Sequence, residues 1–230
     1  MIPPSHPSTV QRRLAVELII LFFLSPLLIV FGIWPKRLTM LLLAIAAVGA
    51  IAFVRNRRAG AAELGIGPAS RAGLGPTLRI GLGLWLLVSL GVGAVHLAMH
   101  RPVAPLLTER PLLFALIVFI YAFSVMAQEF LFRSFFFWRY QPLTSPRVLW
   151  WLNALAFGWV HIVFGSWVSV ALTLIGGALF AGLFLRYRSL LGICIVHAAF
   201  GLSIFAMGYG KYFYHGTAWV AHQLNAGAPR

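Results

Sequence analysis

The chain is dominated by apolar runs about as long as a lipid bilayer is thick. A helix needs about 20 mostly apolar residues to cross a hydrocarbon core of ~30 Å, and about seven runs in this sequence approach or exceed that length. The runs do not alternate between apolar and polar residues as barrel strands do. We therefore predict an all-α fold, a polytopic transmembrane helical bundle of about seven spans. The expected spans are Leu14–Trp34, Leu38–Val54, Ile80–Ala98, Pro111–Trp138, Val148–Phe164, Trp167–Leu185 and Leu190–Tyr209.

Composition and charge exclude a water-soluble globule and argue against a nucleic-acid partner. Hydrophobic residues make up 61% of the chain and charged residues 10%, whereas a soluble domain has about 25% charged residues. The 18 Lys and Arg residues against 4 Asp and Glu give a net charge of +14. A charge of this sign also occurs in nucleic-acid-binding proteins. Here, however, the basic residues lie in the gaps between apolar runs, which is typical of orientation in a bilayer.

The distribution of arginine between the gaps predicts the orientation of the chain. Arginine is more frequent in the gaps on the same side as the N-terminus, which predicts a cytoplasmic N-terminus in a bacterial-type plasma membrane. We expect N-terminal transmembrane helices over 1–110, with a cytoplasmic loop rich in Arg and Gly at 55–79. Core helices that carry the functional site are expected over 111–209, followed by an interfacial tail at 210–230.

Glu129, His161 and His197 are titratable residues inside the predicted spans, where polar groups are costly and therefore indicate function. Glu129 lies deep in the fourth run, with Arg133 four residues later on the same helical face. His161 lies in the fifth run, one turn after Phe157, and His197 lies in the seventh. At a rise of about 1.5 Å per residue, the acid and both histidines lie roughly 12–20 Å from the cytoplasmic ends of their spans.

Several roles fit three such groups at one depth. The Glu129–Arg133 pair fits a structural ion pair, and a single histidine fits a hydrogen-bonded helix contact. Together the three groups fit the base, acid and oxyanion roles of hydrolysis in a water-filled cavity. They also fit zinc ligation or a proton relay in a transporter.

The order and spacing of these residues resemble the CPBP family, the CAAX proteases and bacteriocin-processing enzymes, over about Pro111 to Leu202. The family pattern is Glu-Glu-x-x-x-Arg, then Phe-x-x-x-His, then Ser-Leu followed by His-x-x-x-Asn or Asp. The corresponding segments here are Gln128-Glu129-Phe130-Leu131-Phe132-Arg133, then Phe157 to His161, then Ser189-Leu190 through His197. The resemblance implies an intramembrane glutamate-type endopeptidase similar to the type II CAAX prenyl endopeptidases.

The resemblance also implies site residues and roles. It gives Glu129, His161 and His197 as catalytic residues, with Gln128, Arg133 and Phe157 in support. In the family, the first Glu and the His of the second element activate water; here Glu129 would stand in for that Glu and prepare the water with His161, and His197 would bind the oxyanion. The family's chemistry needs no cofactor or metal ion, so none is expected.

Two positions depart from the family pattern. Gln128 stands where the family has its first Glu, and a glutamine amide cannot take a proton from water. Gly201 stands where the family has Asn or Asp, and glycine supplies no side-chain donor to an oxyanion. Restoring the two residues, by Gln128→Glu and Gly201→Asn, is expected to raise activity.

Three functions follow from these observations. The first is an endopeptidase that cleaves a membrane-associated peptide or protein, with or without a lipid anchor, near the cytoplasmic face. The second is a non-catalytic relative that binds a membrane peptide or partner, as in bacteriocin immunity. The third is a proton-coupled transporter, which is disfavoured because the sequence shows no internal repeat.

Overall fold

The computed structural model describes residues 8–213, and every regular element among them is helical, which confirms the predicted fold class. Two π-helical segments, η1 and η3, interrupt otherwise α-helical spans, and short 3-10 turns form η2, η4 and η5. The elements are α1 (Thr9–Leu18), η1 (Ile19–Leu24), α2 (Ser25–Val30), η2 (Lys36–Leu38), α3 (Thr39–Asn56), α4 (Pro68–Ala98), α5 (Pro105–Glu109), α6 (Pro111–Glu129), η3 (Phe130–Phe135), α7 (Phe136–Tyr140), α8 (Pro146–Val160), η4 (His161–Phe164), α9 (Trp167–Tyr187), α10 (Leu190–Ala206) and η5 (Tyr209–Tyr212).

Six helical segments are long and apolar enough to cross a bilayer, so the chain is an integral membrane protein. They are Thr9–Val30, Lys36–Asn56, Pro68–Ala98, Pro111–Tyr140, Pro146–Phe164 and Trp167–Tyr187. The seventh predicted run forms an apolar helix that is shorter than expected, because α10 ends at Ala206 rather than at Tyr209. Of the predicted tail at 210–230, residues 214–230 lie outside the described part of the chain. The division of the chain at residue 110 stays a prediction.

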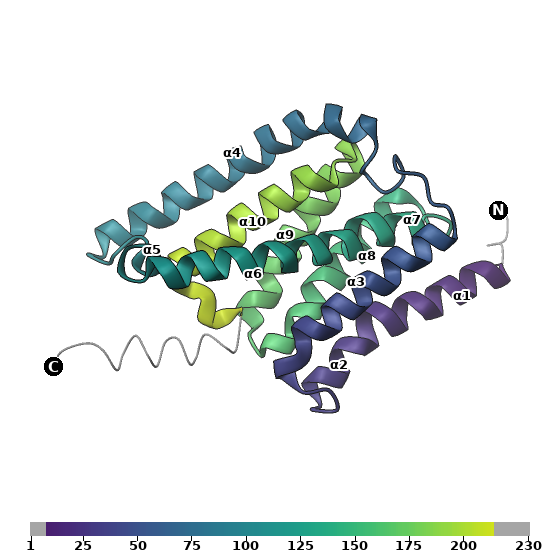
Figure 1. Cartoon of the computed structure of the whole chain (residues 1–230), viewed down its shortest axis with the longest axis horizontal. Helices are drawn as coiled ribbons and strands as arrows, with labels where there is room; N and C mark the ends of the chain where they lie inside the picture. Colours follow the sequence, from purple (N-terminus) through teal and green to yellow (C-terminus); the bar gives the residue numbers. More distant parts are fainter. Residues whose placement is uncertain (1–7, 214–230) are drawn as a thin grey trace, which may run out of the picture.

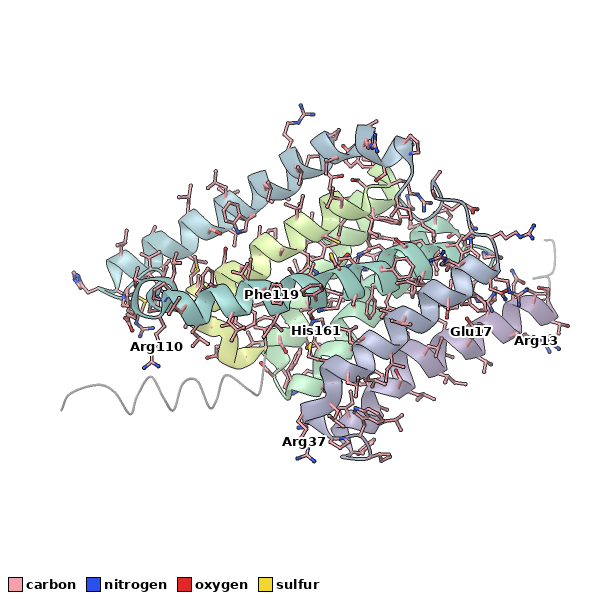
Figure 2. All side chains as sticks on the ribbon, in the orientation of Figure 1. Arg13, Glu17, Arg37, Arg110, Phe119 and His161 are labelled. Atoms are coloured by element: carbon pink, nitrogen blue, oxygen red, sulfur yellow. The ribbon has the colours of Figure 1, made fainter. Side chains whose placement is uncertain are left out.

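Helix α10 lies between α4 and α6, and this arrangement sets the position of the site (Figure 1). Helix α9 packs against α8, α4 and α10. The labelled arginines Arg13, Arg37 and Arg110 lie toward the ends of the bundle, whereas His161 lies near its middle (Figure 2). Charged groups at helix ends and a polar group at mid-depth are the distribution that a bilayer favours.

The predicted loop at 55–79 is much shorter in the structure, because α3 continues to Asn56 and α4 begins at Pro68. Glycine disfavours helix, so the glycine-rich sequence here suggested a loop. In α4, however, Gly73 and Gly81 are buried contacts with neighbouring helices: a Cβ at Gly73 would overlap the backbone of Tyr187, and one at Gly81 the side chain of Val196. Close helix approach through small residues is typical of membrane proteins, and this packing outweighs the poor helix propensity.

The remaining loop between α3 and α4 is fastened to the core of the bundle. The hydroxyl of Ser134, in η3, donates a hydrogen bond of 2.6 Å to the carbonyl oxygen of Leu64. The amide of Leu190, at the start of α10, donates one of 3.0 Å to the carbonyl oxygen of Gly65, where φ is +70°. The loop therefore ties the helix that carries Glu129 to the helix that carries His197.

Candidate active site

Four elements bring the predicted site residues together. Glu129 ends α6, and Arg133 lies in the π-helical η3 that follows it. His161 begins η4, directly after α8, and His197 lies in the middle of α10. A π-helical segment within an α-helix is frequent at functional sites.

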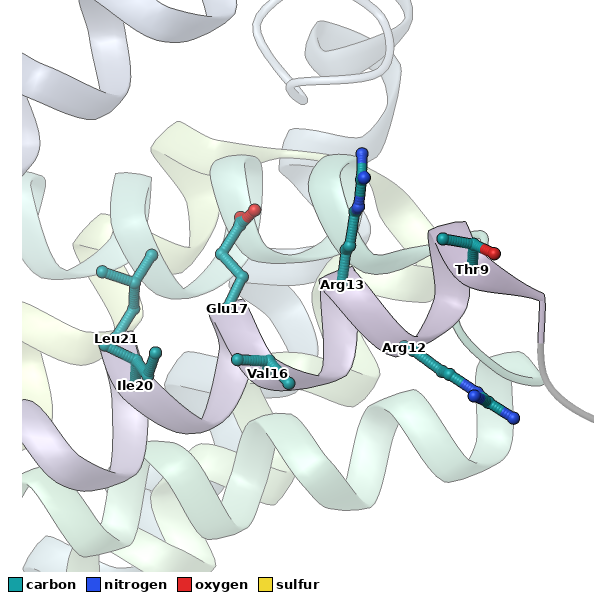
Figure 3. A pocket seen from close by; sticks show the side chains of 7 residues that line it. All are labelled: Thr9, Arg12, Arg13, Val16, Glu17, Ile20 and Leu21. Carbon is teal, nitrogen blue, oxygen red and sulfur yellow. The ribbon is translucent and has the colours of Figure 1, made fainter.

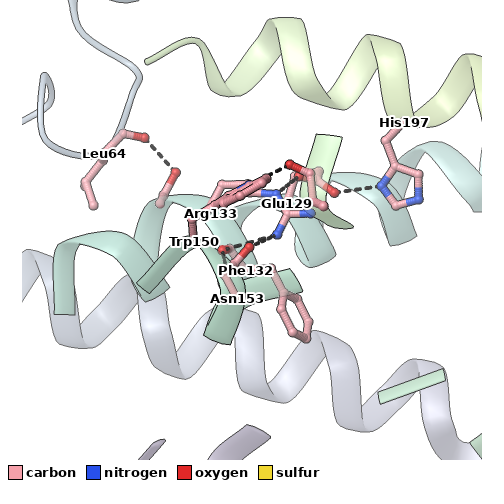
Figure 4. Close-up of polar contacts among 9 residues, drawn as sticks. Leu64, Glu129, Phe132, Arg133, Trp150, Asn153 and His197 are labelled. Atoms are coloured by element: carbon pink, nitrogen blue, oxygen red, sulfur yellow. Dashed lines mark hydrogen bonds and ion pairs between the residues drawn. The ribbon is translucent and has the colours of Figure 1, made fainter. Parts of the chain in front are cut away.

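Both carboxylate oxygens of Glu129 are engaged (Figure 4). Oε1 lies 2.7 Å from Nδ1 of His197, and Oε2 forms an ion pair of 3.0 Å with Nε of Arg133. Neither the Glu129 nor the Arg133 side chain has any exposed surface. A buried charge is tolerated when it is paired and hydrogen-bonded, and here the acid has a cation on one side and an imidazole on the other.

The Arg133 guanidinium is held by an amide and by two aromatic rings. Its Nη1 donates to Oδ1 of Asn153, whose Nδ2 in turn donates to the carbonyl oxygen of Phe132. The guanidinium carbon lies 4.7 Å from the ring centre of Phe157 and 5.8 Å from that of Phe180, a cation–π arrangement. These contacts fix the arginine, and through it they fix the carboxylate of Glu129.

His161 is oriented by its own helix. Its Nδ1 lies 2.7 Å from the carbonyl oxygen of Phe157, four residues earlier. The His161 residue is 7% exposed, as is His197. The Phe157 ring lies 5.0 Å from the His161 ring and 5.6 Å from the His197 ring, centre to centre. One phenyl ring thus contacts both imidazoles and the Arg133 guanidinium.

The Gln128 side chain bonds to another residue of its own helix, α6. Its Nε2 donates a hydrogen bond of 2.8 Å to the hydroxyl oxygen of Ser124, one turn earlier. The amide therefore makes a local contact on α6, while the next residue, Glu129, connects α6 to α10.

Asn153 and Phe180 are part of this network, although neither was predicted from the sequence. Asn153 is a fully buried polar residue in the fifth span, so the rule that selected the histidines applies to it equally. Phe180 stacks on His197, with ring centres 5.1 Å apart. A phenylalanine among many apolar residues carries no comparable signal.

Two surface grooves lie away from this network. One, of about 530 Å³, runs along the start of the first span and is lined by Thr9, Arg12, Arg13, Val16, Glu17, Ile20 and Leu21 (Figure 3). The other, of about 510 Å³, lies beside Trp150 and Arg186. Neither is lined by Glu129, His161 or His197. The expected water-filled cavity around these three residues stays a prediction.

A comparison with known families identifies the segment that holds these residues. Residues 108–203 match the family model described as type II CAAX prenyl endopeptidase Rce1-like. No curated protein and no solved structure matches the chain. Within residues 8–213, no group of three or more His, Cys, Asp or Glu side chains is placed to hold a metal ion. The matched segment covers less than half of the chain, includes Glu129, Arg133, Asn153, His161 and His197, and is similar to the Rce1-like family of membrane proteases.

Proposed function

We propose that this protein is an intramembrane endopeptidase that hydrolyses a peptide bond in a membrane-associated peptide or protein, near the cytoplasmic face. The observation that carries the proposal is the buried hydrogen bond between Glu129 and His197, beside the second imidazole of His161. A carboxylate bonded to one nitrogen of an imidazole fixes its tautomer and orientation for catalysis.

The hydrogen-bond partners of His161 and His197 determine which ring nitrogen of each residue can contact substrate or water. A carbonyl oxygen and an ionised carboxylate only accept hydrogen bonds. His161 Nδ1 must therefore carry the proton donated to Phe157, and His197 Nδ1 the proton donated to Glu129. Nε2 is left free for substrate or water in both residues.

We assign water activation to His161. Its Nδ1–H is bonded to a neutral carbonyl, so the neutral imidazole has an Nε2 lone pair that can accept a proton. The water oxygen attacks the carbonyl carbon of the peptide, and its proton passes to His161 Nε2. That proton then moves to the leaving nitrogen as the C–N bond breaks.

We assign oxyanion stabilisation to His197. A protonated His197 has an Nε2–H donor, and the Glu129 carboxylate at Nδ1 compensates the added charge. This proposal changes the role of Glu129 from the base expected from the sequence. Because both its oxygens are engaged by Arg133 and His197, Glu129 acts as a positioning residue for His197 rather than as the base.

The experiment uses the purified full-length chain in lipid nanodiscs with a farnesylated CAAX peptide, and mass spectrometry of the products. We expect release of the C-terminal tripeptide, and we expect His161→Ala and His197→Ala to lower the turnover number by about 10²–10⁴-fold. The exposed His100 lies outside the site, so His100→Asn is the matched control. Loss of activity in the control but not in the site variants would refute the assignment.

A second candidate, binding without catalysis, is favoured by one observation. Position 128 carries an amide that is bonded to Ser124 and cannot act as a base. If the protein binds the peptide without cleaving it, Gln128→Glu tests whether a missing base is the cause. Cleavage by Gln128→Glu alone, at a rate that a positioned base provides, indicates an enzyme that has lost its base. Binding without cleavage in every variant supports the binding function.

A further inference from the structure

Gly201 lies one helical turn after His197, and its vacant side-chain position is filled from another helix. Gly201 is buried. A Cβ at this position would overlap the hydroxyl oxygen of Tyr121 and the adjacent ring carbons. The phenol of Tyr121, which belongs to α6, therefore occupies the space in which a side chain at position 201 would begin.

Ring contacts hold the phenol beside His197. The Tyr121 and His197 rings are perpendicular, at 88°, with centres 6.0 Å apart. On another side the Tyr121 ring meets Phe205 of α10 edge-on, at 5.4 Å. Tyr121 lies eight residues before Glu129 on α6, so two helical turns separate it from the acid that orients His197.

The hydroxyl of Tyr121 has no hydrogen-bond partner among residues 8–213. By contrast, the other polar groups near His197 are engaged: Glu129 by His197 and Arg133, and the Gln128 amide by Ser124. A phenol is a neutral donor that needs no change of protonation before it can bind an oxyanion. The Tyr121 residue is half-buried.

We propose that the Tyr121 hydroxyl donates a hydrogen bond to the peptide carbonyl oxygen as negative charge develops on it, together with His197. This inference rests on the proposed hydrolase function and adds a catalytic residue to it. Tyr121 then supplies, from α6, the donor that Gly201 cannot supply from α10.

The test is Tyr121→Phe, which removes the hydroxyl and keeps the ring that packs on His197 and Phe205. Removing one oxyanion donor lowers the turnover number by about 10²–10³-fold. We expect a loss of this size in Tyr121→Phe, and we expect its KM for the farnesylated peptide to stay nearly unchanged. The control is Tyr187→Phe, since the Tyr187 hydroxyl accepts a hydrogen bond from Arg186 at the end of α9, away from the site. A turnover number in Tyr121→Phe equal to that of wild type would overturn the assignment and leave the hydrolase function standing.

A second measurement separates this inference from the proposed function. A phosphinic peptide places a charged oxygen where the oxyanion forms, so its affinity reports donors whether or not the protein turns substrate over. We expect Tyr121→Phe to weaken its binding and to leave binding of the uncleaved peptide unchanged. That result in a protein without peptidase activity would refute the proposed turnover and support the Tyr121 assignment. Equal affinity for the phosphinic peptide in wild type and Tyr121→Phe would refute the assignment.

The same contact corrects the expectation for Gly201→Asn. Because a Cβ there overlaps Tyr121, Gly201→Asn alone must displace the phenol and is now expected to lower activity. Tyr121→Ala with Gly201→Asn provides both the space and an amide donor, and we expect it to be more active than either single variant. Full activity of Gly201→Asn alone would contradict the placement of Tyr121.

Discussion

At the scale of single residues, the sequence predicted local contacts better than contacts between helices. The four-residue spacing of Glu129 and Arg133 placed them on one helical face, and the structure pairs them at 3.0 Å. The bond from Glu129 to His197 spans 68 positions in the chain. Its existence depends on how α6 and α10 pack, which spacing along one helix does not determine. Tyr121 was missed for the same reason, since its contact with Gly201 is visible only after packing.

Asn153 offers a direct test of the buried ion pair. Asn153→Ala removes the acceptor of Arg133 Nη1 and leaves a buried charged donor without that partner. We expect the free energy of unfolding to fall by about 1–3 kcal/mol, measured by denaturant titration in mixed micelles. The control, Asn56→Ala, changes an exposed residue at the end of α3 and is expected to change stability little. Equal stability of the two variants would contradict a structural role for Asn153.

At the scale of elements, hydropathy predicted the presence of the spans, and packing set their ends. A backbone in hydrocarbon must satisfy its own hydrogen bonds, so long apolar runs become helices whatever their neighbours. The start of α4 depends instead on glycines that contact α9 and α10. Glycine has a low intrinsic helix propensity when its packing is not known. For this reason, residues 68–79 were expected in a loop.

Two glycines in α4 make a matched pair for testing this packing. A Cβ at Gly81 would overlap both methyl groups of Val196, whereas a Cβ at Gly83 meets nothing within 4 Å. We expect Gly81→Ala to destabilise the protein by about 1–3 kcal/mol through overpacking. Gly83→Ala is expected to leave stability unchanged or raise it by up to about 1 kcal/mol. Thermal unfolding of both variants in the same detergent measures the difference, and the reverse order would refute the α4–α10 contact.

At the scale of the whole molecule, the helix count and the charge bias together predict the orientation. Arginine is more frequent in the gaps on the N-terminal side, and with an odd number of spans this bias predicts a cytoplasmic N-terminus. Reporter fusions after Trp34, Val54, Tyr140 and Arg188 should read outside, inside, inside and inside. A fusion after Arg188 that reads outside would contradict the order of the last spans. The site would then lie toward the opposite face.

The central claim, that Glu129 orients His197 for hydrolysis within the membrane, is tested most directly by Glu129→Gln in the peptidase assay. Glutamine removes the negative charge that compensates a protonated His197, so the imidazole stays neutral and its Nε2–H is a weaker donor to the oxyanion. We predict that the turnover number of Glu129→Gln falls by about 10²–10⁴-fold relative to wild type. Glu109→Gln, which changes an exposed acid in α5, should retain the wild-type rate. Glu129→Gln with wild-type turnover would contradict the account.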